Sequence, residues 1–201
     1  MLIGIGGGGD IVGTIPTSDL LGLFDIECVL GGHSWERSVI DPMPGPRKFD
    51  EVRNARKLNE VVWFANKDTV TSTGVRFAES GVAEVLGEET LLINIHPGPE
   101  AVADGILHAA GELGADLIIG IDVGGDLLAL GNEPGLMSPL ADSIMTASFA
   151  MLEKRMPAIT PGIRNIPKPA PIHPTISTIR ATYEPKRCHA LVNASPRLSS
   201  S

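Results

Sequence analysis

The chain has 201 residues, a formal net charge of −8 and a sequence pI near 5.1. Its acidic balance argues against nucleic acid or an anionic membrane as a partner. It has neither a run of eighteen apolar residues nor a basic leader segment, so we expect a cytoplasmic protein without membrane spans. This length is most simply one folded domain, and the composition is compatible with a homo-oligomer.

Apolar runs alternate with helical patterns along the first 160 residues. Strands are predicted at residues 2–6, 26–30, 61–65, 90–95 and 116–121. Helices are predicted from about residue 12, with Pro16 in the first turn, over 77–86, from about 102 to 113, and from Ser138–Pro139 to Arg155. Gly87 and Gly114 follow two of these helices, as C-terminal caps do.

This alternation predicts a three-layer, Rossmann-like α/β domain with a doubly wound, mostly parallel sheet over residues 1–163. A sixth short strand is predicted at 157–159. Residues 164–201 are rich in proline, and we expect them to be partly extended or disordered, with one edge strand at 175–182. Right-handed crossovers bring the loops that follow parallel strands to one edge of the sheet.

Two of these loops have the same pattern. Leu2–Asp10 and Leu117–Asp126 both read as an apolar run, Gly-Ile, two further residues and Gly-Gly-Asp. Glycines after a buried strand allow backbone N–H groups to approach a ligand. The candidate ligand-binding residues in these loops are Gly6, Gly7, Gly8, Gly9, Asp10, Gly124 and Gly125.

Three interpretations of the glycine loop remain open. Residues 4–9 fit the dinucleotide pattern G-x-G-x-x-G. That pattern also needs an acid at the end of the second strand, where this chain has Gly31-Gly32-His33. The loop can instead bind another phosphate or nucleotide, or serve only as a turn. A Walker-type site is not indicated, because no lysine stands at the required position.

Carboxylates gather around the same loops. Asp10, Asp122, Asp126 and Asp142 are candidate ligands for Mg²⁺ or Mn²⁺, which can also carry substrate phosphates. Asp122, Asp126 and Glu133 are candidate catalytic groups. Alternatively, Asp126 and Asp142 complement helix N-termini and Glu133 is a solvated loop residue.

The loop after the second predicted strand adds further candidates. His33 can transfer a proton, and Arg37 and Arg47 can hold an anion. Equally, Trp35 can anchor the core while Glu36 and Arg37 form a surface pair. Ser138, at the start of a helix, is a further candidate ligand contact.

Four separated motifs in this order resemble a family of uncharacterised archaeal and bacterial proteins, domain of unknown function family 1152. They are GIGGGGDIVG (4–13), GGHSWER (31–37), DPMPGPR (41–47) and GIDVGGDLLALGNEPGLMSPLAD (120–142). The resemblance covers about residues 1–162 and implies a Rossmann-like α/β domain without an established activity. Residues after Ile163 do not continue the family pattern.

The leading hypothesis is an enzyme that acts on a phosphorylated or nucleotide-like small molecule with Mg²⁺, by hydrolysis or group transfer. A non-catalytic nucleotide or metabolite sensor would use the same loops. In a third alternative, the glycines only turn the chain and the protein is an assembly subunit.

Overall fold

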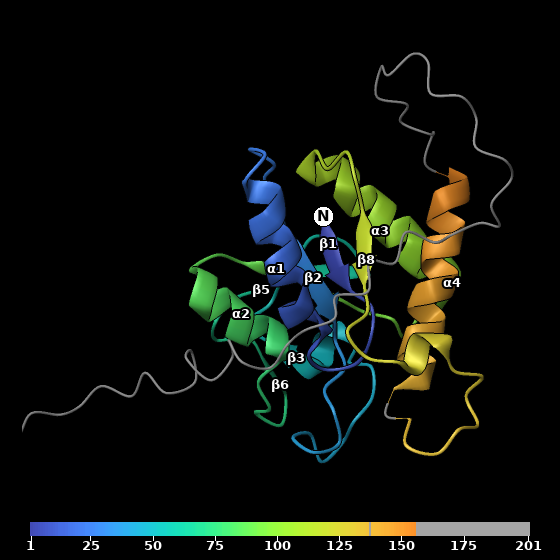
Figure 1. Cartoon of the computed structure of the whole chain (residues 1–201). Helices are drawn as coiled ribbons and strands as arrows, with labels where there is room; N and C mark the ends of the chain where they lie inside the picture. Colours follow the sequence, from blue (N-terminus) through green and yellow to red (C-terminus); the bar gives the residue numbers. More distant parts are fainter. Residues whose placement is uncertain (137, 156–201) are drawn as a thin grey trace, which may run out of the picture.

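A six-stranded sheet forms the centre of the computed structural model, which describes residues 1–136 and 138–155 apart from the Asp126 side chain (Figure 1). The strands of this sheet lie in the order β4-β5-β7-β2-β1-β8, and β3 and β6 form a separate pair. The strands are β1 (Leu2–Gly4), β2 (Leu30–His33), β3 (Val52–Arg53), β4 (Arg56–Lys57), β5 (Val62–Ala65), β6 (Val70–Thr71), β7 (Thr90–Ile93) and β8 (Ile119–Ile121). The helices are α1 (Asp10–Gly22), α2 (Ala78–Leu86), α3 (Pro99–Leu113) and α4 (Pro139–Arg155), with short 3₁₀ turns at Phe49–Glu51 and Asp126–Leu128.

Helices cover both faces of the sheet, α1 and α2 on one and α3 and α4 on the other (Figure 1). Side chains alternate along each strand, so neighbouring residues serve different cores. Leu2 packs with Ile11 of α1 and Val82 of α2, whereas Ile3 belongs to the core that contains Ile106 of α3. The three-layer α/β architecture is therefore confirmed.

Local sequence signals account for the helix ends. Gly87 and Gly114 adopt left-handed conformations, with φ of 73° and 64°, directly after α2 and α3. Ser138 precedes α4 and Pro139 is its first residue, as predicted. Pro16 lies in the middle of α1, because this helix begins at Asp10 and not near Val12. None of the described helices is both long and apolar enough to cross a bilayer.

The predicted second strand was misplaced by several residues. β2 spans Leu30–His33, and Gly31 and Gly32 lie inside it. A Cβ on Gly31 would lie 2.7 Å from the Leu91 Cβ, and one on Gly32 would lie 2.0 Å from the Glu79 Oε1. The glycines were interpreted as the end of the strand, but they are required for close packing within it.

The sheet is mostly parallel, as predicted, with one reversal at its edge. β1, β2, β7 and β8 are parallel, whereas β5 runs antiparallel to β7 and pairs with β4. The two-residue strands β3, β4 and β6 were not predicted. The strand predicted at 157–159 and the segment predicted at 164–201 lie outside the described residues.

Candidate functional site

The two Gly-Gly-Asp loops follow the neighbouring strands β1 and β8 and lie side by side at the edge where these strands end. From β1 the chain passes through α1 to β2 on one side, while α3 leads to β8 on the other side of β1. Ile5 donates a backbone hydrogen bond of 3.0 Å to Ile121, which holds the two loops together. Ligands of open α/β sheets bind outside the carboxyl ends of the strands at such a switch point.

Asp10 connects these loops directly. It is the first residue of α1, and its Oδ2 accepts hydrogen bonds from the Gly6 N–H at 2.9 Å and the Val123 N–H at 3.4 Å. The pKa of Asp10 is raised from 3.8 to about 7, mainly by burial and then by the charges of Asp122 and Asp142. The two N–H groups act in the opposite direction. Asp10 is therefore a buried carboxyl that the fold favours in its protonated form.

Asp122 and Asp142 approach the same point from β8 and α4, and both are buried. Asp122 Oδ1 accepts a 2.8 Å hydrogen bond from the Gly124 N–H. A Cβ on Gly6 would lie 2.4 Å from Asp10 Oδ2 and 3.1 Å from Asp142 Oδ1, so two carboxylates flank this glycine. The structure thus brings together three of the predicted carboxylates. Asp126 lies in the 3₁₀ turn after β8, and its side chain is outside the described part.

Ser138 links α4 to the glycine loop. Its Oγ accepts a 3.1 Å hydrogen bond from the Gly7 N–H and donates one of 3.1 Å to Asp142 Oδ2. A Cβ on Gly7 would lie 2.7 Å from the Ser138 Cβ, so glycine is required for this contact. The predicted contact residue Ser138 therefore lies at the site, where it positions the loop and Asp142.

The rest of the loop contacts residues that follow β2. Gly8 has a φ of 51°, and a Cβ there would lie 2.7 Å from Arg37 Cγ and 3.1 Å from Glu36 Oε2. No atom of the described residues beyond the immediate chain neighbours lies within 4 Å of a Cβ built on Gly9. Gly9 is the N-cap of α1, and no side chain caps this helix start. The partial positive charge at the start of α1 therefore faces the open part of the loop.

His33 ends β2 and is buried, and neither ring nitrogen has a hydrogen-bond partner among the described residues. Burial lowers the pKa of His33 to about 4, although the backbones of Gly6 and of His33 itself act in the opposite direction. The imidazole is therefore neutral at pH 7. A neutral imidazole can accept a proton, so the predicted role of His33 in proton transfer, as acid or base, stays a prediction.

Two buried glutamates beside the loop were missed as site residues. Glu36 is 1% exposed and its Oε1 accepts a hydrogen bond from the Ala78 N–H, so the alternative of a surface pair with Arg37 is wrong. Glu79 lies in the first turn of α2 against Gly32. Burial raises the pKa of Glu36, and burial followed by the charge of Glu36 raises that of Glu79. A carboxylate six residues beyond the predicted strand was the only available signal for Glu36.

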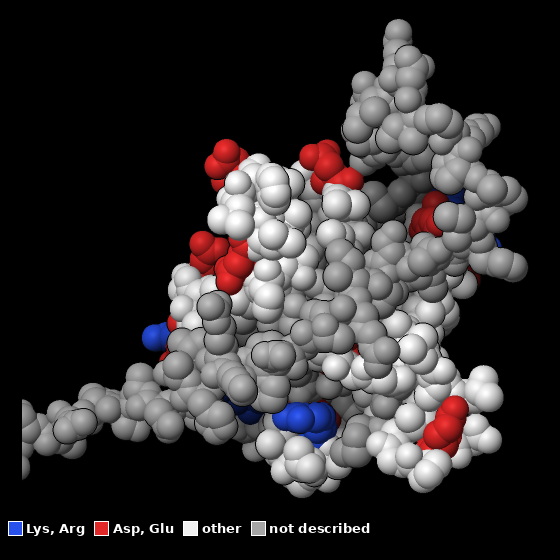
Figure 2. Space-filling view, viewed as in Figure 1, with Lys and Arg blue, Asp and Glu red and all other residues white. Residues whose placement is uncertain are grey.

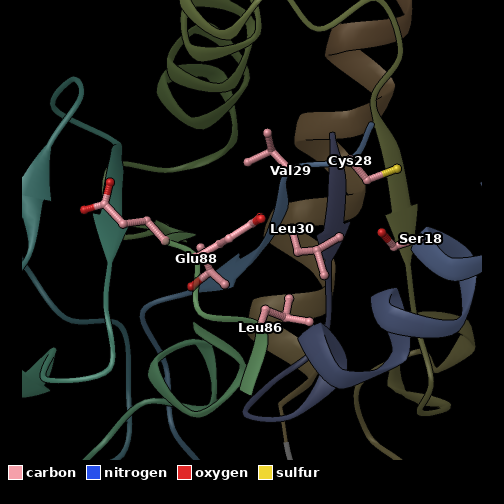
Figure 3. A pocket seen from close by; sticks show the side chains of 8 residues that line it. Ser18, Cys28, Val29, Leu30, Leu86 and Glu88 are labelled. Carbon is pink, nitrogen blue, oxygen red and sulfur yellow. The ribbon is translucent and has the colours of Figure 1, made fainter. Parts of the chain in front are cut away.

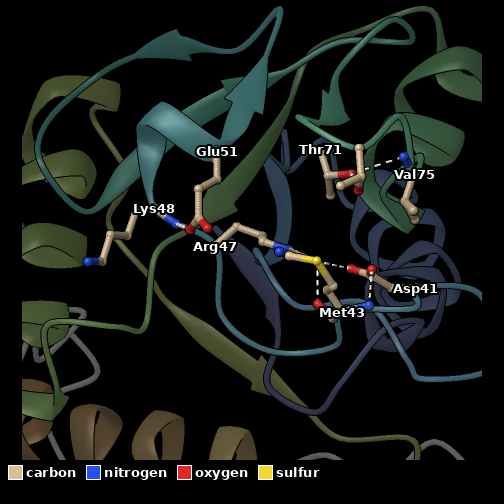
Figure 4. Close-up of polar contacts among 8 residues, drawn as sticks. Asp41, Met43, Arg47, Lys48, Glu51, Thr71 and Val75 are labelled. Carbon is tan, nitrogen blue, oxygen red and sulfur yellow. Dashed lines mark hydrogen bonds and ion pairs between the residues drawn. The ribbon is translucent and has the colours of Figure 1, made fainter.

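Arg47 has a structural partner. Its guanidinium forms a buried 2.6 Å ion pair with Asp41 and also donates to the Met43 carbonyl (Figure 4). Its backbone N–H donates to the Ser34 carbonyl at 2.8 Å. These contacts fasten the proline-rich loop to the end of β2. The predicted binding of a ligand anion by Arg47 would require breaking this ion pair.

Arg37 and Glu133 are exposed. Arg37 contacts the glycine loop, and basic side chains are visible at the lower edge of the molecule, where the parallel strands end (Figure 2). Glu133 accepts hydrogen bonds from the N–H groups of Leu130, Gly131 and Asn132. These bonds lower its pKa, and the residue fits the alternative of a solvated loop carboxylate.

Within residues 1–136 and 138–155, apart from the Asp126 side chain, no group of three His, Cys, Asp or Glu side chains has a geometry that can hold a metal ion. Mg²⁺ is commonly held by one or two carboxylates, water and substrate phosphates. Asp10 and Asp122, whose charges interact, are the residues best placed to supply such carboxylates.

The family follows from comparison with known proteins. Residues 1–163 match the family described as "Protein of unknown function (DUF1152)". The chain belongs to this family. The match extends over all the described elements, including both glycine loops, Ser138 and Asp142. No curated protein and no solved structure matches the chain. The family assignment names no ligand or reaction, so function has to be argued from the site.

Proposed function

We propose that the protein binds a phosphorylated or nucleotide-like small molecule together with Mg²⁺ or Mn²⁺ at the switch point. We further propose that it catalyses hydrolysis or group transfer there. The observation that carries this proposal is the burial of Asp10, Asp122 and Asp142 around the two glycine loops. None of the described ion pairs gives Asp10 or Asp122 a cationic partner.

Buried carboxylates need a compensating charge or a proton. A divalent cation bound by Asp10 and Asp122 would provide that charge, and it would also bind oxygen atoms of a phosphate. Asp142 would remain bound to Ser138 and position the Gly7 segment of the loop. The metal would act as a Lewis acid toward the phosphate.

The surroundings support a phosphate rather than an uncharged ligand. The N-terminus of α1 contributes partial positive charge, and Arg37 contacts the glycine loop from its exposed side. A dinucleotide of the NAD type is less well supported, because β2 ends in the buried His33 and not in a carboxylate that can reach a ribose.

A thermal-shift screen tests the binding part of the proposal. Nucleotides, dinucleotides and sugar phosphates would each be added with Mg²⁺ and with EDTA. A ligand at 100 times its dissociation constant should stabilise the protein by about 2.7 kcal/mol. We expect a metal-dependent shift that Asp122→Asn abolishes. Asp116→Asn, at the opposite edge of the sheet, is the matched control and should retain it.

Turnover separates an enzyme from a sensor. Ligands that give a shift would be incubated with the protein, and phosphate release or group transfer would be followed. Retained binding without turnover would favour a metabolite sensor. If no ligand or metal raises the melting temperature, the glycine loops serve only as turns and the proposal fails.

A further inference from the structure

A second feature lies at the opposite edge of the sheet, where the parallel strands begin. A pocket of about 780 Å³ opens between the end of α1, the segment before β2 and the end of α3. An adjoining pocket of about 190 Å³ extends toward the end of α2 (Figure 3). Both include Ser18, Cys28 and Glu88, so they form one continuous hollow.

Large apolar side chains lie exposed next to this hollow. Leu23 and Phe24, in the turn after α1, are 80% and 68% exposed. Leu20, Ile26 and Leu117 are also about half exposed or more. We call these five residues the apolar edge. Adjacent exposed apolar side chains of this size are typical of a surface that binds another protein.

The charge around the apolar edge is negative. The carboxylates at this edge are Asp19, Asp25, Glu27, Glu88 and Asp116, and none forms an ion pair within the described part of the chain. Three helices, α1, α2 and α3, also end here, and none has a basic residue in its last turn. Their C-terminal carbonyls add further partial negative charge. Acidic side chains are visible at this edge in Figure 2.

We infer that the apolar edge binds a basic amphipathic segment of a partner protein. Apolar side chains of such a segment would cover Leu23 and Phe24, while its Lys or Arg side chains would face the carboxylates and the helix C-termini. A second copy of this chain is a poorer fit, because the same acidic residues would face each other. This inference does not depend on the proposed function.

The test uses the full chain and a synthetic helical peptide of about 16 residues that carries leucines on one face and lysines on the other. Its counterpart carries glutamates in place of the lysines. Binding would be followed by fluorescence anisotropy at low and at physiological salt. We expect the basic peptide to bind more weakly at higher salt and the acidic peptide not to bind.

Two double variants locate the binding. Leu23→Asp with Phe24→Asp removes the apolar contact, and Asp25→Lys with Glu27→Lys reverses the charge. Each should weaken binding of the basic peptide at least tenfold. Val39→Asp with Ile40→Asp, which changes exposed apolar residues in the loop after β2, should leave binding unchanged. Asp122→Asn should also leave it unchanged, which separates this result from the proposed function.

Several results would overturn the inference. If the acidic peptide bound as tightly as the basic one, the contact would be nonspecific and apolar. If both double variants bound the basic peptide as tightly as the parent protein does, the peptide would bind elsewhere. Self-association that is lost in the Leu23→Asp, Phe24→Asp variant would show that a second copy occupies the surface. Binding that appears only after removal of residues 164–201 would show that the chain itself occupies it.

Discussion

Asp10→Asn should make the protein less sensitive to rising pH. The pKa of Asp10 is about 7 in the folded protein, above its ordinary value of 3.8. Its protonated form therefore contributes stability that is fully present below pH 3.8 and lost as the pH rises through 7. From these two pKa values, the free energy of unfolding falls by about 2 kcal/mol between pH 5 and pH 7 because of Asp10 alone. The Asp10→Asn variant lacks this loss because asparagine does not titrate.

The measurement is the free energy of unfolding by urea in EDTA, for parent and variant, at pH 5 and pH 7. The free energy of the variant relative to that of the parent should rise by about 2 kcal/mol between these values. Asp116→Asn, which changes an exposed carboxylate, is the control and should show little change. An equal effect of Asp10→Asn at both pH values would refute the raised pKa of Asp10, and with it the burial and the neighbouring charges of Asp122 and Asp142 as its causes.

Three further predictions concern the loops around the site. Gly8→Ala should lower the free energy of unfolding by about 1–3 kcal/mol and weaken ligand binding, because of the positive φ and the contact with Arg37. Gly125→Ala is the control: no described atom lies near its added methyl group, so urea unfolding should be little changed. Arg47→Met should lower the free energy of unfolding by about 3–5 kcal/mol, because it leaves Asp41 buried without its partner. Arg37→Met, which changes an exposed side chain, should retain stability and weaken phosphate binding in calorimetry. The reverse pattern would contradict these assignments. His33→Phe should retain or increase the melting temperature, because it removes two buried nitrogens that have no hydrogen-bond partner in the described part of the chain. A large loss would indicate a partner for the ring.

The sequence was sufficient to predict the parallel core of the sheet. Alternating strand and helix patterns predicted the layers, and Gly87, Gly114 and Ser138–Pro139 marked helix ends correctly. These signals are local, since each depends on the conformation of one or two residues. The convergence of Asp10 and Asp122 followed from the rule that parallel strands end at the same edge.

Other features depend on contacts between distant residues. Gly31 and Gly32 lie inside β2 because Leu91 and Glu79 pack against them, and no local pattern announces such packing. The direction of β5 is set by its pairing with β7. Glu36 is buried because its carboxylate accepts the Ala78 N–H from α2, forty-two residues away. Charged residues in loops are usually solvated, so this burial could not be anticipated.

Binding of Mn²⁺, followed by the loss of the free-ion signal in electron paramagnetic resonance, tests the central claim most directly. Titration in the presence of inorganic phosphate, read against the same mixture without protein, should show about one additional bound Mn²⁺ per chain, held by carboxylates and phosphate oxygens. Asp122→Asn should weaken this binding at least tenfold, while Asp116→Asn should not change it. Absence of binding, or equal binding by parent and Asp122→Asn, would contradict a metal–phosphate site between the two glycine loops.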